Sequence, residues 1–186
     1  MLRFSLQAFA DLPTPVNLTV HNYFNLDGAA DARDHVLQIE ADHHLVLDPA
    51  QIPTGEIAPV ERSPNLDFRR ERPIRPGDPD HLYDLNYVLR RDGGPGLARA
   101  ATLSSPKSGL ALQLWTTEPG LQLYDAHKVN VAVPGHDGAR HGRFAGIALE
   151  PQRFPDAPNH AHFPSCRLDP GEVSRQVSEL RFAPFG

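Results

Sequence analysis

The sequence predicts an all-β protein built as an antiparallel β-sandwich. Three observations carry this prediction. Apolar and polar residues alternate with a period of two in runs along the whole chain, which in a strand places the apolar side chains on one face. Turn signals containing Gly or Pro separate these runs. No long run has the 3.6-residue spacing of an amphipathic helix.

Four runs show the alternation clearly, and each is predicted to form a strand. The residues that share a strand face are Leu2, Phe4 and Leu6; Leu110, Leu112 and Leu114; Leu121 and Leu123; and Ile147 and Leu149. The turn signals are Asp27-Gly28, Pro53-Thr54-Gly55, Asp92-Gly93-Gly94, Pro119-Gly120, Asp137-Gly138 and Pro170-Gly171. Residues 59–79 are rich in Pro, Arg and Asp, and we expect them to form a long surface excursion.

Length and composition are those of one folded domain. The chain has 186 residues, and we expect residues 1–186 to form a single domain. Its hydrophobic share of 40% and charged share of 22% argue against disorder. The 19 prolines and 14 glycines agree with the many turns and short elements of an all-β protein.

Charge and patterning exclude several classes of partner. A net charge of −5 argues against a general nucleic-acid surface, because phosphate binding needs a concentrated positive field. Arg69, Arg70, Arg72 and Arg75 are interleaved with prolines and acids, as in a solvated loop. No run is long enough to span a membrane, and residues 1–13 lack the continuous apolar stretch of a signal peptide. We therefore expect a soluble, cytoplasmic protein.

The single Cys166 excludes an internal disulfide and offers no metal-ligand pattern. Two polar residues of the predicted strands attract more interest. Glu150 ends a strand on a face with Gly146 and Ala148, and Gln122 points away from its leucine neighbours. A buried, unpaired carboxylate is costly, so an inward Glu150 would need a reason. Alternation alone favours the simpler interpretation, in which both residues face solvent.

Six blocks of sequence, in the same order over nearly the whole chain, resemble the aldose 1-epimerase (galactose mutarotase) family. They are TPVNLTVHNYFNLDG at 14–28; DHVLQIEADHHLVLD with IPTGEIAPV, at 34–48 and 52–60; LYDLNYVL at 82–89; LSSPKSG at 103–109; LQLWTTEPGLQLY at 112–124; and ALEPQRFPDAPNHAHFPS at 148–165. A single block would be a weak signal, whereas six in order are specific.

The resemblance implies the galactose-mutarotase type of β-sandwich, truncated at its N-terminal side, and an enzyme that interconverts the α and β anomers of free aldohexoses such as galactose and glucose. It places Glu150 as the catalytic base and His21 as the catalytic acid, with Asp84 and Gln122 binding the sugar. No metal or organic cofactor is implied. Trp115 could stack on a sugar, but we expect it in the core.

Other histidines could suggest a metal site, but their spacings match no established ligand pattern. They are His43, His44, His136, His141, His160 and His162. We expect them to be surface or loop residues, with His160 the one near the groove.

The sequence departs from the family in several places. Leu2 corresponds to the strand before the block of His21, so an N-terminal region that supplies an arginine and a second histidine has no counterpart. Val20 and Leu85 replace an asparagine and a histidine, and Asp125-Ala126-His127 replaces the usual Thr-Gly-Asn. Missing strands would leave open sheet edges, through which a homodimer could form.

Three functions therefore remain open: an active mutarotase, a non-catalytic sugar-binding relative, and an inactive fragment of a mutarotase. A related epimerase of hexose 6-phosphates ranks below these, because no arginine cluster is tied to the groove.

Overall fold

A computed structural model of the chain describes residues 1–91, 94, 96–136 and 138–185. Its strands are β1 (Leu2–Ala8), β2 (Thr14–Pro15), β3 (Tyr23–Phe24), β4 (Val36–Ile39), β5 (Ala41–Leu47), β6 (Pro53–Pro59), β7 (Arg72–Pro73), β8 (Asp84–Leu89), β9 (Ala98–Ser105), β10 (Leu110–Thr116), β11 (Gly120–Tyr124), β12 (Ile147–Gln152), β13 (Arg167–Leu168) and β14 (Ser174–Pro184). The helical elements are four single 3₁₀ turns: η1 (Ala32–Asp34), η2 (Val60–Arg62), η3 (Pro64–Leu66) and η4 (Ala157–Asn159).

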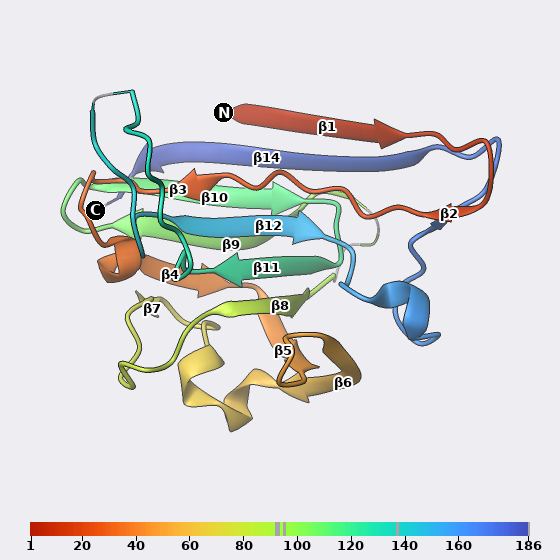
Figure 1. Cartoon of the computed structure of the whole chain (residues 1–186), viewed down its shortest axis with the longest axis horizontal. Helices are drawn as coiled ribbons and strands as arrows, with labels where there is room; N and C mark the ends of the chain where they lie inside the picture. Colours follow the sequence, from red (N-terminus) through yellow and green to blue (C-terminus); the bar gives the residue numbers. More distant parts are fainter. Residues whose placement is uncertain (92–93, 95, 137, 186) are drawn as a thin grey trace.

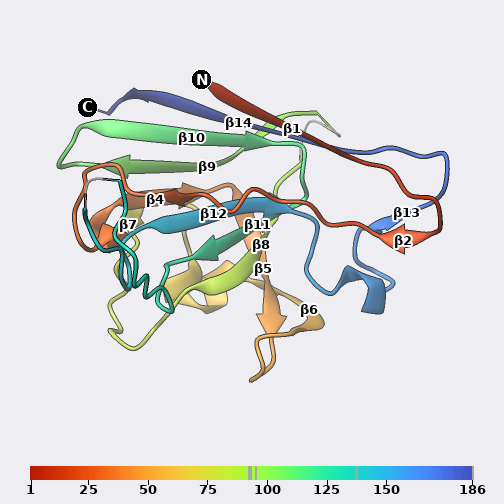
Figure 2. The same cartoon turned by 45° about the horizontal axis from the view of Figure 1, so that its top comes forward.

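The strands form two large antiparallel sheets that pack face to face, which confirms the predicted β-sandwich (Figure 1). The first sheet has the order β1-β14-β10-β9-β4-β7 and the second the order β3-β12-β11-β8-β5-β6. Figure 2 shows β14, β10 and β9 as one layer above β12, β11 and β8. β13 and β2 form a separate small sheet.

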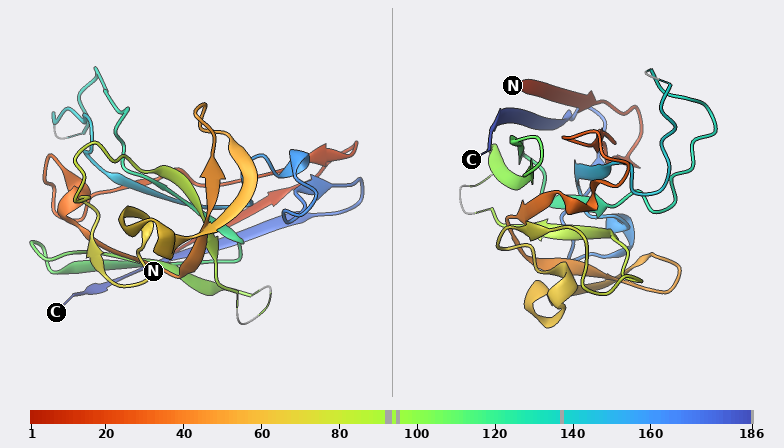
Figure 3. Two further views of the ribbon diagram at one scale, coloured as in Figure 1. Left: turned by 90° about the horizontal axis from the view of Figure 1, so that it is seen from below. Right: turned by 90° about the vertical axis from the view of Figure 1, so that its left-hand side faces the viewer.

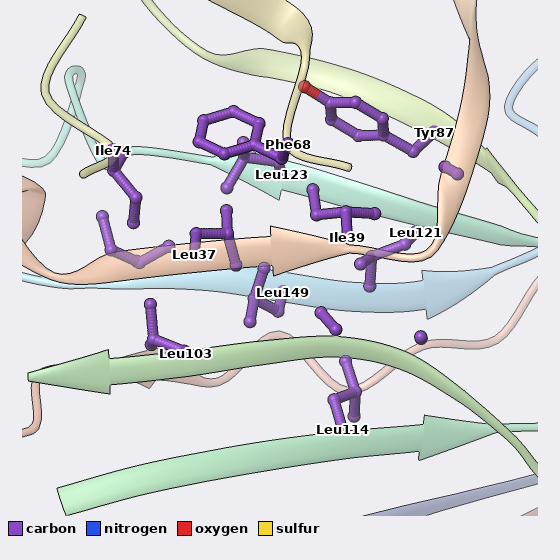
Figure 4. Close-up of a cluster of buried hydrophobic side chains, with 14 of the residues drawn as sticks. Leu37, Ile39, Phe68, Ile74, Tyr87, Leu103, Leu114, Leu121, Leu123 and Leu149 are labelled. Atoms are coloured by element: carbon purple, nitrogen blue, oxygen red, sulfur yellow. The ribbon is translucent and has the colours of Figure 1, made fainter. Parts of the chain in front are cut away.

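The main hydrophobic core fills the space between the two sheets. It includes Leu37 and Ile39 of β4, Leu103 of β9, Leu114 of β10, Leu121 and Leu123 of β11, and Leu149 of β12 (Figure 4). Leu112 of β10 belongs to the same core, and all these residues are almost fully buried. Leu112, Leu114, Leu121, Leu123 and Leu149 belong to the alternating runs of the sequence, so the predicted strand faces in β10, β11 and β12 are correct. Because one face of the second sheet is committed to this core, the alternate residues must lie on its opposite face.

The segment after β6 differs from the predicted surface excursion. Val60, Leu66, Phe68 and Ile74 are buried in the main core, so residues 59–79 wrap around the sandwich and close one side of it. Several of their arginines pair locally. Arg69 bonds to Asp67 at 2.8 Å, Arg72 donates to backbone carbonyls and lies 4.0 Å above the ring of Phe68, and Arg75 reaches Asp34 at 2.6 Å. The apolar residues are too widely spaced here to show a strand or helix period, which is why alternation missed them.

β1 forms one edge of the first sheet. It pairs with β14 from Leu2↔Leu180 to Ala8↔Ser174, so the first strand of the chain lies alongside the last (Figure 3). The turn predictions at 92–94 and 137–138 include Asp92, Gly93 and Asp137, which lie outside the described residues. No helix in the described part is long and apolar enough to cross a membrane.

Candidate active site

A groove of about 380 Å³ lies on the face of the second sheet that points away from the main core. Its lining residues are His21, Asp84, Gln122, Tyr124, Lys128, Glu150, Gln152 and Pro155. They come from β8, β11 and β12 and from the segments next to β3, β11 and β12. All four residues that the sequence assigns to the site, His21, Asp84, Gln122 and Glu150, are among them.

Strand register explains why these residues meet. In the antiparallel pair β11–β12, Gln122 lies opposite Glu150, and in the pair β11–β8, Tyr124 lies opposite Asp84. β3 pairs with β12 through Tyr23↔Ala148. Continuing that register by two residues in each strand brings His21 opposite Glu150.

Side-chain hydrogen bonds hold the segment before β3 in this register, although it is not a strand. Asn17 Nδ2 donates to the carbonyl of Arg153 at 3.0 Å, and the amide of Arg153 donates back to Asn17 Oδ1 at 2.9 Å. Thr19 Oγ1 donates to the carbonyl of Pro151 at 2.9 Å. These bonds tie residues 17–21 alongside β12 and its extension, and they deliver His21 to Glu150.

His21 and Glu150 are in direct contact, with 3.1 Å between His21 Nε2 and Glu150 Oε1. The two side chains differ in exposure, since that of His21 is 49% exposed and that of Glu150 only 8%. The interpretation of Glu150 as a solvent-facing residue is therefore wrong. Its carboxylate is buried at the floor of the groove, and the imidazole of His21 supplies the partner that such burial requires.

Burial raises the pKa of Glu150 above its ordinary value of 4.5, because the desolvated carboxylate is less stable than the neutral acid. His21 acts in the opposite direction, and the negative charge of Asp84 adds to the increase. A carboxylate with a raised pKa is a stronger base than one in water, which suits a group that must accept a proton from a hydroxyl.

Asp84 and Gln122 form a second polar pair in the groove. Gln122 Nε2 donates to Asp84 Oδ1 at 2.9 Å, and Lys128 Nζ lies 3.2 Å from Asp84 Oδ2. Asp84 is half-buried and keeps acceptor capacity beyond these two contacts, because a carboxylate offers about four lone-pair sites. The groove therefore presents acceptors and donors of the kind that hydroxyl groups bind.

Aromatic rings frame the histidine. The ring of Tyr23 lies 4.9 Å from that of His21, and the ring of Tyr124 meets His21 edge-on at 6.4 Å. Tyr23 and Tyr124 also contact each other at 6.2 Å. These contacts restrict the imidazole of His21 to the Glu150 side of the groove, although the histidine itself is open to solvent.

Several residues of the site were missed by the sequence analysis. Tyr124 and Gln152 lie on the same strand faces as Gln122 and Glu150, so alternation carried a signal for both. Asn86 lies opposite Gln122 on β8 but does not line the groove; it is 1% exposed, and its side chain has no hydrogen-bond partner among the described residues. A Cβ on Gly120 would lie 2.6 Å from Asn86 Oδ1, so only glycine leaves room for this amide. Nothing in the sequence pointed to Lys128, which lies in the turn after β11.

Trp115 occupies neither of its two expected places. It lies on β10, on the face away from the main core, and is half-buried beneath Arg181, whose guanidinium carbon is 4.2 Å from the ring centroid. Trp115 does not line the groove, so the structure gives it no sugar-stacking position.

Of the six histidines considered for a metal site, none lines the groove as the structure describes it. His44 is buried on β5, against the expectation that it is a surface residue. His160 contacts Asp156 at 3.1 Å and lines a separate hollow with Phe163 and Cys166, so its expected place near the groove is wrong. In the described part of the chain no group of three or more His, Cys, Asp or Glu side chains is placed to hold a metal ion.

Comparison with known proteins identifies the family of this chain. The family model "Aldose 1-epimerase" matches residues 1–181. Human galactose mutarotase is 37% identical over 184 residues, which are 95% of this chain and 52% of that protein. The aldose 1-epimerase of Escherichia coli K12 is 35% identical over 191 residues, with 97% of this chain and 54% of that protein covered.

Solved structures agree. The GalM/aldose epimerase homologue from C. elegans superposes with a TM-score of 0.90 at 29% identity, over 99% of this chain and 56% of that one. The galactose 1-epimerase of Lactobacillus acidophilus gives a TM-score of 0.78 at 27% identity, over 99% and 53%. The chain spans about half the length of the curated relatives it matches. On its sequence and its fold, this chain belongs to the aldose 1-epimerase family.

Proposed function

We propose that this chain is an aldose 1-epimerase, which interconverts the α and β anomers of free aldohexoses such as galactose and glucose. The observation that carries the proposal is the contact of 3.1 Å between His21 Nε2 and the buried carboxylate of Glu150, in a groove that also holds Asp84 and Gln122. Two proton-transfer groups beside hydroxyl-binding groups are what ring opening of a sugar needs.

In the proposed reaction Glu150 is the base and His21 the acid. Glu150 takes the proton of the anomeric hydroxyl while His21 donates a proton to the ring oxygen. The bond between the anomeric carbon and the ring oxygen breaks, and the electron pair of the hydroxyl becomes the second bond of the aldehyde. Rotation about the adjacent carbon–carbon bond exposes the other face of the aldehyde, and reclosure with the two proton transfers reversed gives the other anomer.

The position of each group supports its role. The buried Glu150 has a raised pKa and is therefore a better base, whereas the imidazole of His21 has ring nitrogens that can donate or accept a proton. In the bound state a sugar would replace the direct contact of His21 with Glu150, with its ring oxygen at the imidazole and its anomeric hydroxyl at the carboxylate. Asp84 and Gln122 would bind hydroxyl groups farther along the ring.

We further propose that residues 1–186 act as a single domain, because one core joins the two large sheets and one groove collects all four site residues. The alternative is a sugar-binding relative without turnover, or an inactive fragment of a mutarotase. Its support is that the chain spans about half the length of its relatives.

Polarimetry of freshly dissolved α-D-galactose or α-D-glucose tests the proposal. We expect the purified chain to speed the approach to the equilibrium rotation well above the rate in buffer, and His21→Ala to remove most of this acceleration. Equal rates for the wild-type chain and buffer would refute catalysis. Sugar binding without acceleration would identify the non-catalytic alternative, and loss of both would indicate an inactive fragment.

A further inference from the structure

We propose that Lys128 is a specificity-determining residue, which together with Asp84 binds two neighbouring hydroxyl groups of the sugar. This inference rests on the proposed function and extends it to the substrate's hydroxyl pattern. Lys128 Nζ lies 3.2 Å from Asp84 Oδ2 at the wall of the groove. Neighbouring hydroxyl oxygens of a pyranose ring lie about as far apart as two hydrogen-bonded atoms. A donor and an acceptor at this separation can therefore each bind one of them.

Both members of the pair have hydrogen-bonding capacity to spare. The ammonium group of Lys128 has three donors and uses one on Asp84. Asp84 accepts from Lys128 through Oδ2 and from Gln122 through Oδ1. Since Gln122 orients the carboxylate from one side and Lys128 from the other, the remaining lone pairs of Asp84 and the remaining donors of Lys128 are available to a ligand in the groove.

The turn that carries Lys128 is held in place by a buried carboxylate. Asp125 is completely buried, and it accepts hydrogen bonds from the amides of Tyr83 and His127, each at 3.2 Å. His127 Nδ1 lies 2.7 Å from the same carboxylate, and the amide of Lys128 donates to the hydroxyl of Tyr124 at 3.0 Å. Because Tyr83 directly precedes Asp84, these bonds fix the backbone of Lys128 relative to that of its partner.

The backbone conformation of this turn also indicates that the position of Lys128 is fixed. Ala126 has φ = 61°, in the left-handed region that favours glycine, and a non-glycine residue there costs roughly 1–3 kcal/mol. Asp125, the residue before Ala126, holds the turn in this conformation through its hydrogen bonds. The sequence Asp125-Ala126-His127 thus builds a fixed support for the residue that follows it.

Stability alone does not account for the pair of Lys128 with Asp84. The side chain of Lys128 is 64% exposed, and an exposed ion pair contributes only about 0–1 kcal/mol to folding. Within the groove, however, Lys128 is the single lysine or arginine among the lining residues that the structure describes, beside two carboxylates. A lone ammonium there gives the groove a donor that Asp84 and Glu150 lack, and it reduces the repulsion between the two negative charges.

Affinity for D-glucose and for its series of single-hydroxyl deoxy analogues tests the inference, measured by calorimetry for binding and by polarimetry for turnover. Lys128→Met removes the charge and keeps most of the side chain's length. We expect it to weaken glucose binding by roughly tenfold to hundredfold, since a hydrogen bond to a charged group is lost, and to change KM more than kcat. The matched control is Lys107→Met, at the other lysine of the chain, which is exposed and outside the groove; it should bind as the wild type does.

The analogues identify the hydroxyl. The deoxy analogue that lacks the hydroxyl bound by Lys128 should have the same affinity for the wild type and for Lys128→Met. The analogue that lacks the adjacent hydroxyl should have the same affinity for the wild type and for Asp84→Asn. Unchanged or tighter glucose binding by Lys128→Met would overturn the inference. So would an order of affinities among the analogues that is the same for the wild type and for Lys128→Met. If sugar binding responds as expected but no turnover is found, the proposed function fails and the role of Lys128 stands. A wild-type chain that binds no glucose overturns both.

Discussion

Replacing Glu150 by glutamine tests the centre of the proposed mechanism. The substitution preserves the size of the side chain and removes its ability to accept a proton. It also replaces the carboxylate that contacts His21 at 3.1 Å by an uncharged amide. A positioned general base contributes about 10²–10⁴-fold to a rate, which corresponds to about 2.7–5.4 kcal/mol in the barrier. We expect Glu150→Gln to lower kcat by a factor in this range.

The assay is polarimetry of freshly dissolved α-D-glucose, with the rate in buffer subtracted. Glu118→Gln is the matched control, because Glu118 is also buried, burial also raises its pKa, and it lies outside the groove. The control should keep the wild-type rate, and circular dichroism should show the same fold for both variants. A wild-type rate for Glu150→Gln, or an equal loss in Glu118→Gln, would refute the assignment of Glu150 as the base.

Three further outcomes follow from the structure. The pKa of Glu150 is higher in the folded chain than its ordinary 4.5, so its contribution to stability is fully present below pH 4.5 and is lost as pH rises through the folded pKa. Urea unfolding across this range should show a decrease in the free energy of unfolding that Glu150→Gln lacks. Parallel pH dependences for the two proteins would contradict the burial argument. Leu121→Ala, at a completely buried site between the sheets, should lower the free energy of unfolding by about 2–5 kcal/mol. Leu12 is 75% exposed, so Leu12→Ala should lower it by at most about 0.5 kcal/mol. Similar urea midpoints for the two variants would be inconsistent with the core described here. The free edge of β1 should pair two copies of the chain, so light scattering should give a dimer for the wild type and a monomer for Leu2→Lys, and a wild-type monomer would disprove the edge contact.

Alternation in the sequence predicted those parts of the fold in which one strand face meets the core. Leu121 and Leu123 point inward and Gln122 outward, as their spacing indicates, because successive side chains of a strand must point to opposite faces. The same rule misjudged Glu150. A strand has two faces, and the pattern does not show whether the second face is open to water or covered by another segment. Here residues 17–21 lie beside β12 and bury the carboxylate.

The sequence by itself indicated the sandwich class and the family, and it named four residues that the structure brings together in one groove. Strand faces follow from a period of two, and family motifs preserve residue types in order. Only the tertiary structure decided that residues 59–79 enclose the core, that Asn86 is buried behind Gly120, and that Lys128 reaches Asp84. Each of these depends on contacts between segments far apart in the chain. Their geometry is set by packing and by buried hydrogen bonds such as those of Asp125, which leave no periodic signal in the sequence.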